Sequence, residues 1–467
     1  MISQYLSHRR FRRRLKSIYK KHQRNRRNIQ IMNEDKTFLD IGKNIHSYDE
    51  AIKYFLPKNL AYLTGYKNSI FYIDKLKKEK YKRKGIYMVP EYFSIIDNAK
   101  QSYEFLSSII AAFIFQTCAH IELDYRNCKK VDLASQVLLD AILLDINKFI
   151  NLCKKAKVYD KYIRLSSIGG CNIENKNVIR MLYSIGSPAE LINRRYYFKY
   201  IIPYKLRRFD KEKLSANSAL IQKEIDTTTL LNYVNSCLSR VGKSLKKEAA
   251  QELGYVIGET LINAEEHSSL KYRYLIGYFE ECTQNGKHFG LLNLVIMNFG
   301  QTIYEKFKNP IDITQINSEC LDKMKELSDK FKSHSFFKKD KFTEETLWTL
   351  YSLQGGVSCI PRSVCHRGNG TIQFINSFFK LKGDEKVDDI SRMYLLSGNT
   401  RIDFDGTYKL IEQEDGYPGG IISFNASGKL TDAPDEKYVR NVPEYFPGTI
   451  IFAKLLINDD DLNNENE

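Results

Sequence analysis

Residues 252–269, ELGYVIGETLINAEEHSS, are the most informative stretch of this sequence. Apolar residues recur in it every three or four positions, which predicts an amphipathic helix. At about 100° per residue they gather on one side, which we expect to face the core. This side consists of Leu253, Val256, Ile257, Leu261 and Ala264. Glu259, Asn263 and His267 are spaced four apart and form a polar stripe along its flank. Such a stripe is typical either of a cleft floor or of a solvated helix edge.

The segments around this helix predict one unit over residues 215–457. Helices are expected at 227–241 and 245–267, followed by a hairpin whose Asn285-Gly286 turn joins 272–282 to 288–297. A charged insertion at 304–343, which we expect to be mobile, precedes a helix near 344–353. Strands at 393–396, 401–404 and 449–456 complete the unit. Helices on one side of a largely antiparallel sheet make an α+β layered sandwich.

Three further motifs follow in order along this unit. VIMNFGQTI, residues 295–303, places Asn298 and Gly300 directly after a predicted strand. LQGGVSCIPRSVCHRGNGTIQF, residues 353–374, has a glycine-rich segment that opens a predicted helix, where backbone N–H groups and the helix dipole can hold phosphate oxygens. FPGTIIFAKLLI, residues 446–457, carries Thr449 at the start of the last strand.

Together these motifs resemble the nucleotide-binding boxes of the GHKL superfamily of gyrases, heat-shock chaperones, histidine kinases and MutL proteins. Residues 259–267 match its E-x-x-x-N-A-x-x-H pattern. The resemblance covers about half the chain and implies a two-layer α/β sandwich that binds ATP and Mg²⁺. It implies that Glu259 is the catalytic base that activates the attacking water and that the Asn263 carbonyl binds Mg²⁺. A neutral amide suits the metal because it adds no charge beside three phosphates.

The resemblance also assigns the remaining nucleotide contacts. Asn298 and Gly300 correspond to the D-x-G-x-G box that contacts the base, but Asn298 replaces the aspartate and Thr302 replaces the second glycine. An asparagine can accept from the adenine amine or turn its amide toward a keto purine, so adenine and guanine both stay open. Thr449 is expected to face the base. The phosphate contacts are expected from Gly356, Arg367, Gly368, Asn369, Gly370 and Thr371.

Residues 36–206 predict a smaller α/β unit. Strands are expected at 120–125 and 162–167, helices at 131–152 and 177–185, a turn at Gly169-Gly170 and a helix end at Gly186. This stretch loosely resembles a STAS-like domain. In that family a serine near a strand-to-helix junction is phosphorylated, and Ser135 is the nearest equivalent.

The net charge of +16 is concentrated in residues 1–35, because the first 32 residues hold eleven Lys and Arg and no acid. Residues 8–28, HRRFRRRLKSIYKKHQRNRRN, could bind nucleic acid phosphates or an acidic membrane surface, or form a solubilising arm. Residues 458–467 are acidic and predict a disordered tail. No apolar run is long enough to span a membrane and no secretory signal is present, so a cytoplasmic protein with reduced cysteines is expected.

Three functions fit these features. The first is a slow ATPase that acts as a conformational switch on an unidentified protein partner, as a nucleotide-dependent homodimer, in bacterial signalling or phage defence. The second is a serine/threonine kinase of the anti-sigma type that acts on a STAS-like substrate. The third is a non-catalytic module that binds nucleotide structurally and nucleic acid through the basic arm.

Overall fold

The computed structural model describes residues 37–186, 198–210, 216–241, 243–266, 270, 272–284, 287–309, 318–334, 341–355, 357, 370–381, 390–411, 420–457 and 462–464. They form a mixed α/β structure with parallel and antiparallel sheets. Within these residues no helix combines the length and the apolar character that crossing a bilayer requires.

The N-terminal unit is built on a three-stranded parallel sheet in the order β1-β3-β5, beside a two-stranded parallel pair, β2 and β4. Its elements are α2 (Tyr48–Phe55), α3 (Lys58–Gly65), η1 (Ile73–Lys75), β1 (Lys82–Met88), β2 (Tyr92–Phe93), α4 (Ala99–Ile114), β3 (Cys118–Asp124), β4 (Lys130–Val131), α5 (Leu133–Lys155), α6 (Tyr159–Tyr162), β5 (Ser167–Cys171) and α7 (Lys176–Ile185). The Asp132 side chain caps α5 by accepting from the Ser135 N–H (2.6 Å), and Gly186 ends α7 at φ +58°.

The C-terminal unit is built on a five-stranded antiparallel sheet in the order β10-β11-β9-β8-β6. Its elements are β6 (Ile201–Asp210), α8 (Ala216–Leu238), η3 (Ser239–Val241), β7 (Lys243–Leu245), α9 (Lys247–Glu266), β8 (Tyr272–Gln284), β9 (Lys287–Phe299), α10 (Ile303–Lys308), α11 (Ser318–His334), α12 (Glu344–Ser352), α13 (Gly370–Leu381), β10 (Arg392–Phe404), β11 (Val439–Ile457) and β12 (Leu462–Asn464).

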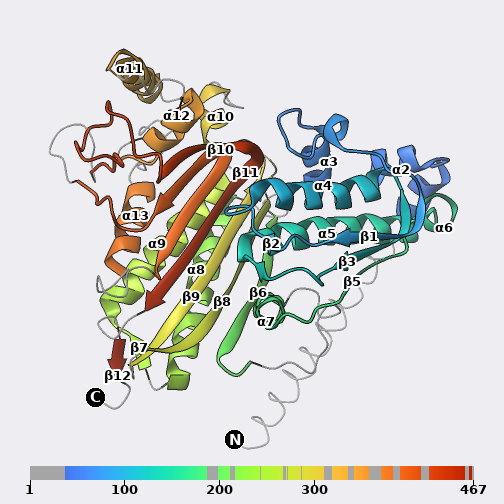
Figure 1. Cartoon of the computed structure of the whole chain (residues 1–467), viewed down its shortest axis with the longest axis horizontal. Coiled ribbons are helices and arrows are strands. Elements are labelled where there is room, and N and C mark those ends of the chain that lie inside the picture. The colour runs from blue at the N-terminus through green and yellow to red at the C-terminus, as the bar shows by residue number, and fades with distance from the viewer. Residues whose placement is uncertain are drawn as a thin grey trace, which may run out of the picture.

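Both faces of the five-stranded sheet are covered, as Figure 1 shows. Alternate residues of β9 belong to different cores, because successive side chains of a strand point to opposite faces. Leu292, Leu294 and Ile296 pack in the core beneath α8, α9 and α13. Val295 and Met297 pack in the core that continues into the N-terminal unit, below α4 and α5. The two units therefore share one buried interface.

The predicted hairpin is confirmed by the pairing of β8 with β9, although Asn285 and Gly286 lie outside the described residues. The predicted helices that became α5, α7, α9 and α12 are confirmed within a few residues. Helix α8 begins eleven residues before the predicted start at Thr227, because residues 216–226 contain neither Gly nor Pro to stop it.

Five other expectations require correction. Residues 162–165 are not a strand, and the expected turn at Gly169-Gly170 lies inside β5, where pairing with β3 overrides the low strand propensity of glycine. Strand β6 crosses the predicted boundary at 206 and pairs with β8. The insertion at 304–343 contains α11 and most of α10. The tail is not disordered throughout, because Leu462–Asn464 pair with β7.

Candidate functional site

A row of polar side chains crosses one end of the five-stranded sheet, on the face that α8, α9 and α13 cover. Asn298 is the penultimate residue of β9, and the register places it opposite Thr449 of β11, which in turn lies opposite Ser397 of β10. All three side chains are buried. The Thr449 and Ser397 hydroxyls are 3.0 Å apart, and the Ile303 N–H donates to Ser397 Oγ (3.0 Å). The structure thus brings two predicted base contacts, Asn298 and Thr449, side by side.

Asn298 differs from its neighbours because its amide is unsatisfied. The residue is 0% exposed, and neither its Nδ2 nor its Oδ1 has a hydrogen-bond partner. Leaving a buried polar group without a partner costs about 1–3 kcal/mol. A donor and an acceptor at one amide, both buried and both unused, fit a ligand that presents an acceptor beside a donor.

Two glycines allow the chain to approach this row closely. Gly300 lies at φ +133°, and its N–H donates to the Pro447 carbonyl (3.2 Å). Gly448 lies at φ +151°, and a Cβ there would lie 2.1 Å from the Asn298 carbonyl oxygen. Any other residue at position 448 would displace β9. Glycine there therefore allows Thr449 to lie directly beside Asn298.

Thr302 has a clear role although it departs from the glycine of the family pattern. It is the N-cap of α10, where its hydroxyl accepts from the Glu305 N–H (3.2 Å) and the Glu305 carboxylate accepts from the Thr302 N–H (2.9 Å). The sequence signal for this capping box was present as T-x-x-E. The segment after Asn298 therefore turns directly into a helix.

Glu305 links this segment to the N-terminal unit. Its carboxylate accepts from the Tyr445 hydroxyl (2.8 Å) and from the hydroxyl of Tyr66, which follows α3. Burial, together with the Glu305 carboxylate, raises the pKa of Tyr66 to about 12, so the hydroxyl stays protonated and donates. Sequence patterns gave no sign of this contact, because the two residues are 239 positions apart.

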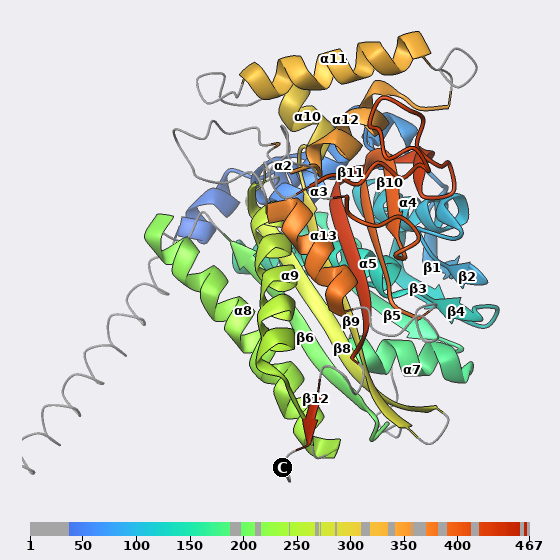
Figure 2. The same cartoon turned by 90° about the vertical axis from the view of Figure 1, so that its left-hand side faces the viewer.

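Helix α9 lies between α8 and α13, and these three helices cover the face of the five-stranded sheet that carries Asn298 (Figure 2). Its expected core face is confirmed for Leu253, Val256, Ile257 and Leu261, all buried at 2% exposure or less. The backbones of Glu259 and Asn263 lie in α9, whereas their side chains lie outside what the structure describes, as do the Ala264 side chain and the whole of His267.

Helix α13 begins at Gly370 and is fixed on α9 by a hydrogen bond from the Ser377 hydroxyl to the Glu252 carboxylate. Ser377 lies seven residues after the start of α13, about 10 Å along the axis. Glu259 lies seven residues after Glu252, and α9 continues toward the Asn298 end of the sheet, where β8 begins. Figure 2 shows α13 lying alongside α9, in agreement with the Ser377–Glu252 contact.

The other predicted phosphate contacts cannot be placed. Gly356, Arg367, Gly368 and Asn369 lie outside the described residues, and for Thr371 only the backbone, in the first turn of α13, is described. The first N–H groups of a helix have no partner within the helix. The backbone of α13 therefore provides hydrogen-bond donors at its N-terminus.

A buried ion pair that the sequence analysis missed lies next to the polar row. Arg273 precedes Tyr274, which pairs with Met297, so Arg273 is level with Asn298 on the neighbouring strand. It is 1% exposed, and its Nη2 lies 2.5 Å from Asp226 Oδ2 of α8. A charged residue in the otherwise apolar first half of β8 was the available signal.

Ser135 does not present an accessible hydroxyl. It is 0% exposed, and its Oγ accepts from the Ile95 N–H (2.7 Å). Phosphorylation there would require α5 to separate from the segment before α4.

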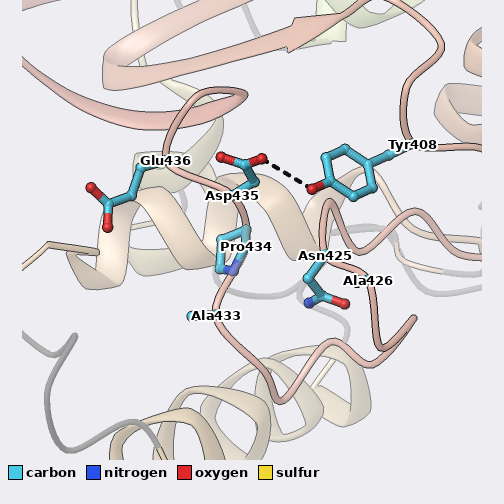
Figure 3. A pocket seen from close by; sticks show the side chains of 7 residues that line it. All are labelled: Tyr408, Asn425, Ala426, Ala433, Pro434, Asp435 and Glu436. Carbon is cyan, nitrogen blue, oxygen red and sulfur yellow. Dashed lines mark hydrogen bonds between the residues drawn. The ribbon is translucent and has the colours of Figure 1, made fainter.

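A shallow hollow lies away from these residues, between Tyr408 and the loop that carries Asn425 and Asp435 (Figure 3). The Tyr408 hydroxyl donates to Asp435 Oδ2 (3.0 Å). None of the predicted site residues lines it, and its open, mutually bonded polar groups resemble an ordinary surface loop.

Comparisons with protein-family models, with curated proteins and with solved structures found no match to this chain.

Proposed function

We propose that this chain binds Mg-ATP between the helices and the sheet of its C-terminal unit and hydrolyses it slowly as a conformational switch. The observation that carries the proposal is the buried, unpartnered amide of Asn298 beside the Thr449 hydroxyl. The Watson–Crick edge of adenine presents an amine donor next to a ring-nitrogen acceptor, and a primary amide can pair with both. The aspartate of the GHKL pattern can only accept, so asparagine here is a functional replacement.

The positions of α9 and α13 support a triphosphate at the same end of the sheet. The first turn of α13 provides backbone N–H groups, and α13 packs on α9, which carries Glu259 and, one helical turn later, Asn263. This supports a GHKL-type sandwich for the C-terminal unit, with a STAS-like unit on the other face of its sheet. The family roles then assign Asn263 to Mg²⁺ and Glu259 to the water.

The proposed reaction at these residues is in-line hydrolysis of ATP. Glu259 takes the proton of the attacking water as its oxygen bonds to the γ-phosphorus, and the bond to the β–γ bridging oxygen breaks to leave ADP and inorganic phosphate. Mg²⁺ would neutralise charge on the phosphate oxygens. The α13 N–H groups would hold the γ-phosphate in line with the water.

A series of contacts links Asn298 to the N-terminal unit. The segment after Asn298 forms the cap of α10, and α10 carries Glu305, which accepts from Tyr66 of the N-terminal unit. Nucleotide binding at Asn298 would therefore bias the position of Tyr66 and change how the N-terminal unit, or a loaded dimer, meets its protein partner.

The test is nucleotide binding and turnover by the purified full chain, with ATP and GTP, with and without Mg²⁺. Glu259→Ala should lower turnover at least about 100-fold while retaining binding, because general base catalysis contributes roughly 10²–10⁴. Glu248→Ala, an exposed acid in the first turn of the same helix, is the matched control. Wild-type turnover by Glu259→Ala would refute the hydrolytic mechanism.

Labelled γ-phosphate separates hydrolysis from a kinase activity. Release as free phosphate supports the ATPase. Label on protein would support the kinase instead, and the burial of Ser135 then directs the search to a substrate in trans.

A further inference from the structure

A basic surface lies at the end of the N-terminal unit where the strands of its parallel sheet begin. Residues 75–84, KLKKEKYKRK, lead into β1 and contain one acid, Glu79. Residues 154–164, KKAKVYDKYIR, end α5, form α6 and approach β5, and contain one acid, Asp160. The exposed cations of these two segments are Lys75, Lys77, Lys78, Lys80, Lys82, Arg83, Lys84, Lys154, Lys155, Lys157, Lys161 and Arg164.

Contacts between the segments show that these cations share one surface. The Arg164 guanidinium lies over the Tyr81 ring, 5.4 Å from its centroid, and the Arg164 N–H donates to Gln116 just after α4. Lys82 pairs with Cys118 at the start of β3, and its N–H donates to the Thr117 carbonyl (2.8 Å). The starts of β1 and β3 and the ends of α4 and α5 therefore meet there, at the right of Figure 1.

The N-terminal arm joins the fold beside this surface. Residues 37–43 are helical, the Phe38 ring lies 5.7 Å from Lys155 Nζ, and Gly42 packs against the Ala156 carbonyl at the end of α5. In the sequence, eight residues separate the basic segment 8–28 from Thr37, where the described fold begins.

We propose that this basic surface binds the phosphate backbone of single-stranded nucleic acid. Tyr81 is 53% exposed and stands among the cations beneath a guanidinium, an arrangement on which a base can stack. Within residues 75–84 and 154–164, all of which the structure describes, Tyr81 is the exposed large apolar side chain. Ile73, Ile86 and Met88 are also exposed beside these segments, so the test includes vesicles, whereas the Tyr81 ring paired with the Arg164 guanidinium favours single-stranded nucleic acid.

The test is fluorescence anisotropy with labelled single-stranded RNA and DNA, duplex DNA, and vesicles containing phosphatidylserine, across a salt series. The site variant carries Lys77→Gln, Lys80→Gln, Arg83→Gln and Arg164→Gln in the full chain. Each lost phosphate contact reduces the salt slope on single strands by about 0.7, so four contacts correspond to a slope change of about 3 and up to about 200-fold in affinity at 0.15 M salt.

The control removes four lysines from the C-terminal unit, at Lys325, Lys330, Lys332 and Lys429. The proposal expects wild-type binding by the control and weaker, less salt-dependent binding by the site variant. Equal loss in both variants, no loss in the site variant, or binding to vesicles with none to single strands would overturn it.

Discussion

Replacing Asn298 by leucine separates a ligand-binding role from a structural one, because the two roles predict opposite effects on stability. Leucine branches at Cγ as asparagine does, although it is larger, and it has no polar atom. Without nucleotide, Asn298 buries an amide donor and acceptor that have no partner, each at a cost of about 1–3 kcal/mol. The substitution should raise the free energy of unfolding by about 2 kcal/mol, or the Tm by roughly 2 °C for a chain of this size.

Nucleotide binding should respond in the opposite direction. ATP at 100 times its Kd stabilises the wild-type chain by about 2.7 kcal/mol, whereas Asn298→Leu should show no such shift at the same concentration. Differential scanning calorimetry with and without Mg-ATP measures both effects on one sample.

Asn293→Leu is the matched control. Asn293 lies on the same strand, is also buried, and points to the opposite face of the sheet. It should leave the nucleotide-induced shift unchanged. A lower Tm for unliganded Asn298→Leu, or an intact nucleotide shift, would refute the assignment of Asn298 to the base.

Two other predictions concern the residues around the site, and a third concerns a buried carboxyl group of α5 in the N-terminal unit. Gly448→Ala should abolish nucleotide binding and destabilise the fold by more than about 1 kcal/mol, because its Cβ would displace the Asn298 carbonyl; urea unfolding and a binding titration test it. Arg273→Ala should lower the unfolding free energy by less than the roughly 3–5 kcal/mol that breaking a buried pair costs, because Asp226 keeps its contact with Arg207 (3.5 Å), whereas Arg273→Ala combined with Asp226→Asn should recover part of the loss. Burial raises the pKa of Asp145 to about 6 despite the nearby Arg208, so the folded chain binds more protons than the unfolded chain between about pH 4 and 6 and loses stability as pH rises through that window; Asp145→Asn should be more stable than wild type at pH 8 and similar at pH 4.

Local signals predicted the elements that depend on neighbouring residues. The Asn285-Gly286 dipeptide between alternating segments predicted the β8–β9 hairpin, and apolar periodicity predicted the buried side of α9. Features that depend on distant pairing were missed. Neither the pairing of β6 with β8 nor that of Leu462–Asn464 with β7 is encoded in the period of its own segment.

The candidate site divides in the same way. Asn298 and Thr449 could be nominated because each lies in a recognisable motif, and the structure places them opposite each other. Ser397 and Arg273 could not, because their importance arises from strand register across three different pairings. The T-x-x-E spacing indicates a helix cap at Thr302, a role that the D-x-G-x-G box does not suggest because it has a glycine at this position.

The interface between the two units has a practical consequence for anyone who cuts this chain. A fragment that begins at residue 215 would lack β6, leaving the hydrogen-bonding edge of β8 open to other strands. It would also expose to water the apolar side chains of Ile276, Val295 and Met297, which now lie against the N-terminal unit. Such a fragment is expected to aggregate, so a shortened chain should retain residues from 37 onward.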